Sequence, residues 1–195
     1  MKEDIKKQLE SKNKEIYLNK LNLDLDNNVE VLVLILNNLF INVKDNSVKV
    51  VLGLVEGFEQ EELISNIIEN FLSKYQKKIM SLINIKIENL RKSFTVDNIL
   101  NEYRDNMVKE NKKIKQEIID YGKDEVIKLI GDLINISDNE LYKKRIDKYF
   151  KNIFINSLCD KIIDVLVNRD IILINTFQES YLKYLDLNSK TIKFE

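Results

Sequence analysis

Apolar residues recur every three or four positions through the middle of the chain. In the stretch 58–92 the recurring positions, with Lys86 interrupting the series, are Ile64, Ile68, Phe71, Tyr75, Ile79, Leu82 and Leu90. This spacing places the side chains on one face of an α-helix. We therefore predict a helix over residues 58–92, with Glu61 and Glu62 in its first turn favoured by the helix dipole.

Two more stripes of the same period follow. One runs from Val96 to Leu133, with Thr95 as its predicted N-cap. The other runs from Tyr142 to Ile172 and opens with Ser137 and Glu140, which have the spacing of a capping box. Each of the three predicted helices is roughly 35 to 45 residues, or about 50 to 65 Å, long. Short connections make neighbours antiparallel, so we predict a mainly α fold, an elongated antiparallel bundle of long helices.

The first 57 residues are less regular, and the cluster of Asp and Asn residues at 24–28 predicts a turn. Leu21, Leu23 and Leu25 alternate with polar residues, as in a strand. The apolar run 29–36 suits a buried strand or a buried helix, and we favour a helix over 29–39. Small β-hairpins are alternatives where 40–44 and 48–52 flank the polar residues 45–47, and at the chain end, where 185–187 and 191–194 flank 188–190.

These patterns divide the chain into three parts. We expect an N-terminal apolar subdomain at 1–57, a long three-helix region at 58–185 and a C-terminal tail at 186–195. The alternative is a single core that all parts share.

The composition excludes much familiar chemistry. The chain has no His, one Cys and four Gly. It therefore lacks a Ser-His-Asp triad and His-ligated zinc, and its glycines form no phosphate-binding loop. Cys159 is interpreted as a buried apolar thiol. We expect no catalytic residues and no cofactor. The many Ile, Lys and Asn residues match AT-rich codons and say little about the fold.

Charge gives a second exclusion. The 31 basic and 32 acidic side chains leave a net charge of -1, so we expect no whole-molecule attraction to nucleic acid or anionic lipid. Two local groups of basic residues can hold phosphates or lipid headgroups, although solvated helix faces explain them as well. They are Lys143, Lys144, Arg145, Lys148 and Lys151, and Lys74, Lys77 and Lys78.

The N-terminus is charged, and the longest apolar run, 31–36, is far shorter than the roughly 20 residues of a spanning helix. We therefore expect no transmembrane segment and a cytoplasmic location. Peripheral contact with a membrane stays open as an alternative.

In three pairs of carboxylates the two members are three residues apart. On a helix this spacing lets both members chelate one Mg²⁺ ion. The pairs are Glu59 and Glu62, Glu102 and Asp105, and Glu117 and Asp120. Their ExxE-then-ExxD order resembles that of the all-α nucleoside-triphosphate pyrophosphatases, but with a longer interval, and it implies a Mg²⁺-dependent nucleotide hydrolase. We favour solvated helix faces.

Three helices of this length offer more apolar stripe than one molecule can cover. The aromatic residues of the last helix are candidates for a partner interface as well as for the core: Tyr149, Phe150, Phe154, Phe177 and Tyr181. The sequence thus favours a non-enzymatic helical interaction protein, a scaffold, adaptor or inhibitor, that self-associates or docks to a protein partner. The alternatives are a non-specific nucleic-acid or membrane-surface binder and the Mg²⁺-dependent hydrolase.

Overall fold

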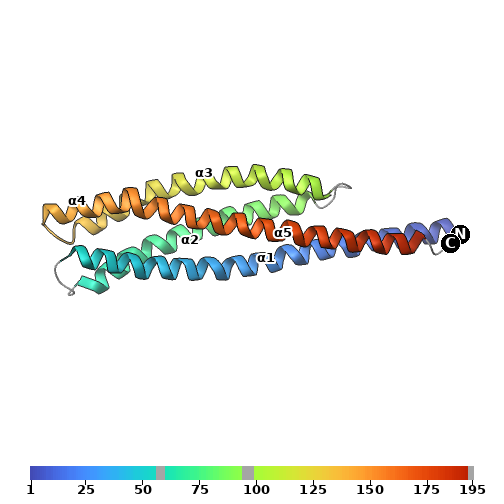
Figure 1. Cartoon of the computed structure of the whole chain (residues 1–195), viewed down its shortest axis with the longest axis horizontal. Helices are drawn as coiled ribbons and strands as arrows, with labels where there is room; N and C mark the ends of the chain where they lie inside the picture. The colour runs from blue at the N-terminus through green and yellow to red at the C-terminus, as the bar shows by residue number, and fades with distance from the viewer. Residues whose placement is uncertain (56–59, 94–98, 193–195) are drawn as a thin grey trace.

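The chain folds into a bundle of long α-helices (Figure 1). The computed structural model describes residues 1–55, 60–93 and 99–192, and these contain no strand. The elements are α1 (Lys2–Leu54), α2 (Glu61–Lys92), α3 (Ile99–Ile134), α4 (Glu140–Lys148), the π-helical segment η3 (Tyr149–Phe154) and α5 (Ile155–Ile192). Because α4, η3 and α5 follow one another without a break, they form one continuous helix. The predicted mainly α bundle of long helices is confirmed.

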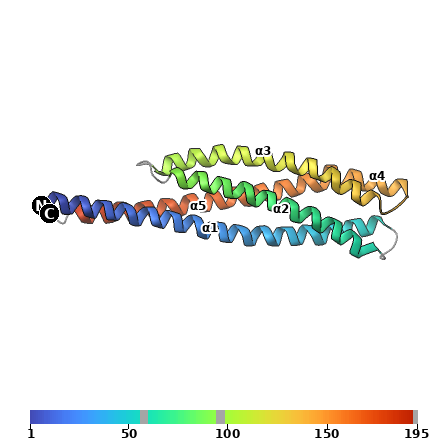
Figure 2. The same ribbon diagram turned by 180° about the vertical axis from the view of Figure 1, so that it is seen from behind.

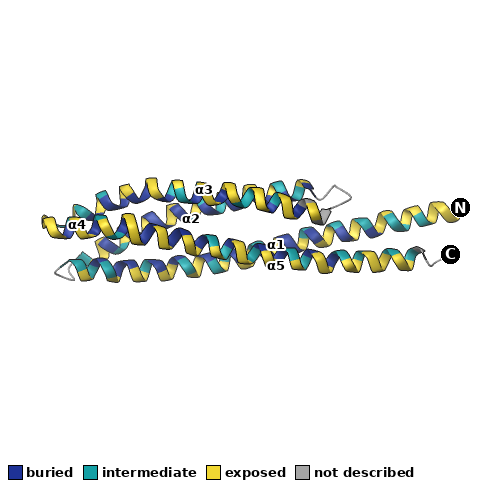
Figure 3. Cartoon of the chain, turned by 45° about the horizontal axis from the view of Figure 1, so that its top comes forward, coloured by how far each residue is buried: buried dark blue, intermediate teal, exposed yellow. Residues whose placement is uncertain are grey.

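Each long helix packs against two others. α1 contacts α2 and α5, and α3 contacts α2 and the α4–α5 helix. The buried apolar side chains of all these helices belong to one cluster, so the described parts of the predicted N-terminal subdomain and three-helix region share a core. Figure 3 shows the buried faces turned inward where the helices lie side by side.

The N-terminal third is one helix, so the strand pattern at 21–25 and the hairpin at 40–52 are wrong. The polar cluster at 24–28 suggested a turn because Asp and Asn favour turns. In the structure Ser180 Oγ donates to Asp24 Oδ2 at 2.9 Å, and Arg169 donates to Asn28 Oδ1 at 2.8 Å. These polar residues therefore join α1 to α5 instead of interrupting α1.

The C-terminal helix begins two residues later than the predicted capping box indicates. Asn139 is the N-cap, and its Oδ1 accepts from the backbone N–H of Leu141 at 2.9 Å and of Tyr142 at 3.3 Å. The hydroxyl of Ser137 instead accepts from the N–H of Asn139. Thr95 lies outside the described residues.

The predicted tail at 186–195 continues α5 as far as Ile192, so its first hairpin strand and turn are helical. Residues 193–195 lie outside the described part of the chain. Together with α1, this helix accounts for the length of the molecule.

Gly122 of α3 lies tightly against side chains of α2 and α5. A Cβ atom at this position would lie 2.8 Å from Ile155 Cδ1 and 2.8 Å from Tyr75 Oη. Gly131, on the same helix, has nothing within 4 Å of its Cβ position. Only the first of these two glycines is required for packing.

These two glycines provide a matched pair of substitutions. We predict that Gly122→Ala lowers the free energy of unfolding by about 1–3 kcal/mol, because Tyr75 and Ile155 must move. Gly131→Ala should raise it by about 0.5–1 kcal/mol, because alanine is the better helix former. Urea unfolding followed by circular dichroism measures both. Equal effects of the two substitutions would contradict the packing role of Gly122.

Candidate functional site

The first part of α1 and the last part of α5 continue past the other helices as a pair (Figures 1 and 2). Two contacts mark where α2 and α3 stop: Arg91 of α2 donates to Asn22 of α1 at 2.7 Å, and Tyr103 of α3 stacks on Phe177 of α5 at 4.8 Å between ring centroids. We call residues 2–21 and 178–192 the two-helix extension. By helix geometry its α1 part is about 30 Å long.

Polar and aromatic contacts hold the two helices of the extension together. Asn13 Nδ2 donates to Asn188 Oδ1 and to Thr191 Oγ1, each at 2.9 Å. Tyr17 stacks on Tyr184, with ring centroids 4.7 Å apart, and lies 6.1 Å from the ring of Tyr181. The extension thus has a specific register rather than a loose apolar seam.

The extension contains a shallow hollow of about 230 Å³. Half of its lining residues are apolar or aromatic, namely Ile16, Tyr17, Tyr184 and Leu187. The other four are Asn13, Lys20, Ser180 and Lys183. The hydroxyl of Tyr17 is buried and makes no hydrogen bond within the described residues. Burial, reinforced by the two neighbouring tyrosines, raises the pKa of Tyr17 to about 12, so this phenol stays neutral. The hollow can accept an apolar side chain.

A polar cluster is buried between α2, α3 and α5. Lys86 Nζ lies 2.5 Å from Asp170 Oδ2 and donates to Asn111 Oδ1 at 2.8 Å. Asn111 Nδ2 donates to the same oxygen of Asp170 at 2.7 Å. Because Lys86 and Asp170 are both buried and each is paired, the cluster is a structural contact between three helices.

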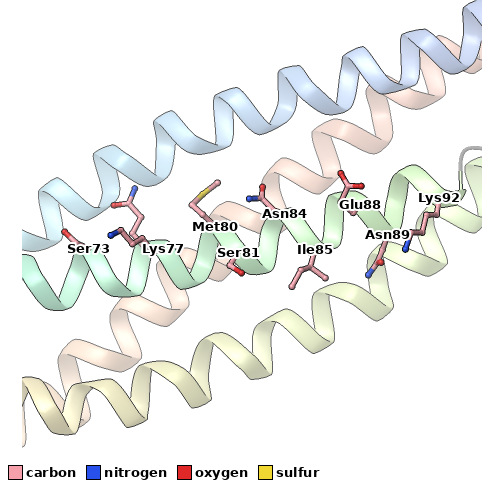
Figure 4. Close-up of a pocket in the computed structure, with 10 residues that line it drawn as sticks. Ser73, Lys77, Met80, Ser81, Asn84, Ile85, Glu88, Asn89 and Lys92 are labelled. Carbon is pink, nitrogen blue, oxygen red and sulfur yellow. The ribbon is translucent and has the colours of Figure 1, made fainter.

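The outer face of α2 forms an open groove of about 890 Å³ (Figure 4). All of its lining side chains belong to α2: Ser73, Gln76, Lys77, Met80, Ser81, Asn84, Ile85, Glu88, Asn89 and Lys92. Two of its polar groups reach neighbouring helices, since Gln76 donates to Asn37 and Asn89 donates to Glu110. These contacts brace α2 between α1 and α3.

The only cysteine is part of the core. The Tyr75 hydroxyl donates to the carbonyl oxygen of Ile118 at 2.8 Å, and Cys159 Sγ lies 3.3 Å from the same hydroxyl. Since the tyrosine proton is used on the carbonyl, the thiol donates to the tyrosine oxygen. Burial raises the pKa of both Cys159 and Tyr75.

Comparison with known protein families, with curated proteins and with solved structures found no match for this chain.

The carboxylate pairs do not meet. Glu62 lies in the first turn of α2. Glu117 is next to Ile118, whose carbonyl oxygen accepts from Tyr75, thirteen residues further along α2 than Glu62. The two carboxylates are therefore about 20 Å apart along the bundle. Asp105 lies near the opposite end of α2, and Asp120 accepts from Gln116 at 2.8 Å. Glu59 and the side chain of Glu102 lie outside the described part. Among the described residues no three acidic, Cys or His groups gather as a metal site.

The basic residues of α2 project in different directions. Lys74 pairs with Glu125 of α3 at 3.1 Å, and Lys78 lies over the ring of Tyr121 at 5.6 Å. Lys77 lines the groove on the outer face of α2. Two of the three cations are thus engaged by α3, which weakens the interpretation as a phosphate-binding stripe.

Acidic neighbours pair with only some of the cations in the second basic group, residues 143–151. Lys143 pairs with Glu140 at 3.6 Å, and Lys151 pairs with Asp147 at 3.0 Å. Lys144, Arg145 and Lys148 are exposed. They remain available for weak contacts with anions.

The aromatic interface candidates lie mainly inside the molecule. Phe150, Phe154 and Phe177 are buried in the core, and Tyr149 and Tyr181 are half-buried against it. The exposed apolar residues of the extension, such as Ile16 and Leu187, were not predicted from the sequence. Finding them would have required pairing residues 13–17 with residues 181–191, and no local pattern indicates this pairing.

One stretch of α1 is long and apolar enough to cross a membrane by length and composition alone. We expected no transmembrane segment from the sequence, and the composition of α1 does not support this expectation. The same helix places Asp24 and Asn28 in polar contacts with α5, as a bundle helix does.

The environment of Cys159 makes its reactivity testable. We predict that Cys159 of the folded protein reacts with a thiol reagent at pH 8 at least about 100 times more slowly than in 8 M urea, because it is buried and its raised pKa leaves it protonated. Absorbance of the released thiolate measures both rates. The folded rate should rise as the pH approaches the raised pKa. Equal rates in the folded and unfolded protein would contradict the core position.

Proposed function

We propose that this protein is a non-enzymatic helical interaction protein that acts by self-association or by docking to a protein partner. The observation that carries the proposal is the hollow of the two-helix extension, where Ile16 and Leu187 are exposed beside two tyrosines. An exposed apolar hollow beside aromatic rings is suited to receiving an anchor side chain of another protein.

The surrounding structure supports a role in binding. The extension stands clear of α2 and α3, so a partner can approach it from more than one side (Figure 3). Asn13 and Tyr17 fix the two helices in one register, which keeps the lining residues in place before binding. Such preorganisation reduces the entropy lost on association.

The sequence supports the same proposal by what it lacks. A chain without His and without a Gly-rich phosphate loop has few means of acid–base or nucleotide chemistry near neutral pH. The cytoplasmic location expected from the sequence stays a prediction.

The test uses the full chain as bait in extracts of its own host, with its mass measured by light scattering after size-exclusion chromatography. We expect the wild-type protein to self-associate or to retain a specific protein. Leu187→Glu should reduce this association at least about 30-fold, because it places a charge in the hollow.

Val108→Glu is the matched control, since Val108 is exposed on α3, outside the extension. It should leave the association unchanged. A wild-type chain that stays strictly monomeric at high micromolar concentration and retains no protein would contradict the proposed function.

A further inference from the structure

Four large aliphatic side chains stand exposed in one line along α1. Ile16, Leu23, Leu34 and Ile41 expose 50%, 53%, 64% and 57% of their surface. At 100° per residue they fall within about 20° of one another around the helix axis. We call these four residues the α1 stripe. It is about 38 Å long, and it runs from the extension into the part of the bundle where α1 also packs against α2.

The spacing of the α1 stripe is the same in both directions. The intervals between its members are seven, eleven and seven residues. A second α1 helix that runs antiparallel can therefore place Ile16 opposite Ile41 and Leu23 opposite Leu34, and the two-fold axis repeats both contacts. A parallel copy in register also matches these apolar positions, but it places Lys12 beside Lys12 and Asp45 beside Asp45, and like charges repel.

The charges near the stripe fit the same alignment. With Leu23 opposite Leu34 of a second copy, Lys12 comes level with Asp45 of that copy, and both lie within about 30° of the stripe centre. Both side chains are exposed, and neither makes an ion pair within the part of the chain that the structure describes. The two-fold axis creates this attractive pair twice.

We propose that the α1 stripe is an interface between two copies of this chain, packed antiparallel with Leu23 of each copy against Leu34 of the other. This inference rests on the proposed interaction function and names its partner. Two-fold dimers are the commonest protein assemblies, and their interfaces use the same patch on both copies. A seam between single helices is at the small end of specific interfaces, so dimerisation should depend on concentration.

Sedimentation velocity of the full chain over a concentration series tests the interface. The wild-type protein should pass from monomer to dimer. Leu34→Glu should raise the dissociation constant at least about 30-fold, since the charge meets Leu23 of the other copy twice. The matched control is Ile127→Glu on α3, which is equally exposed but lies outside the stripe, and it should dimerise as the wild type does.

A charge exchange tests the alignment. Lys12→Glu should weaken the dimer on the order of 5-fold at low salt, because the introduced carboxylate would then face the carboxylate of Asp45. Adding Asp45→Lys should restore the wild-type dissociation constant. If the second substitution weakens the dimer further, this register is wrong.

Cysteine cross-linking tests the orientation, with wild-type chain as the control for the buried Cys159. Under mild oxidation, a chain with both Leu23→Cys and Leu34→Cys should form covalent dimers, whereas Leu23→Cys alone should not. Cross-linking by Leu23→Cys alone would indicate parallel packing and overturn the proposal.

The outcomes separate this inference from the broader function. A dimer that Leu34→Glu leaves intact would overturn the stripe interface while keeping self-association. A wild-type monomer at every concentration would overturn the inference, even if another protein occupies the stripe. In that case the proposed function would depend on the Leu187→Glu comparison alone.

Discussion

The buried contact between Lys86 and Asp170, completed by Asn111, constrains the bundle more than any apolar contact does. Apolar side chains on long helices tolerate a shift of one helix by a turn, because similar side chains recur at that spacing. A shift of α5 would instead carry Asp170 away from Lys86 and toward Ile83, Ile87 or Ile114, which are all buried. Leaving a buried charge without its partner costs about 3–5 kcal/mol. The polar cluster therefore fixes how α2, α3 and α5 lie along one another.

That register determines what projects from the bundle. With α5 fixed against α2 and α3, its last turns must run past the point where Arg91 and Tyr103 mark the ends of those helices. α1 follows α5 because polar contacts recur along their seam, at Asn13, Asp24 and Asn28. The exposure of the extension and of its hollow is thus a consequence of helix register.

The sequence predicts the helices that have a regular apolar period and fails where polar residues play a tertiary role. The stripe from Ile64 to Leu90 predicts nearly the whole of α2, since its apolar period is broken only at Lys86. Asp24 and Asn28 indicated a turn because their partners, Ser180 and Arg169, are about 150 residues away in the chain. The candidate site was missed for the same reason. Its lining combines the two chain ends, and periodicity describes only one segment at a time.

A double-mutant cycle on the buried ion pair tests this account most directly. Lys86→Met and Asp170→Leu should each lower the free energy of unfolding by about 3–5 kcal/mol, because each leaves one buried charge without its partner. The chain that carries both should lose far less than the two losses combined, because no buried charge is left unpaired. Chemical unfolding of the four proteins measures the coupling. Additive losses would show that Lys86 and Asp170 contribute independently and would contradict the central place of their contact.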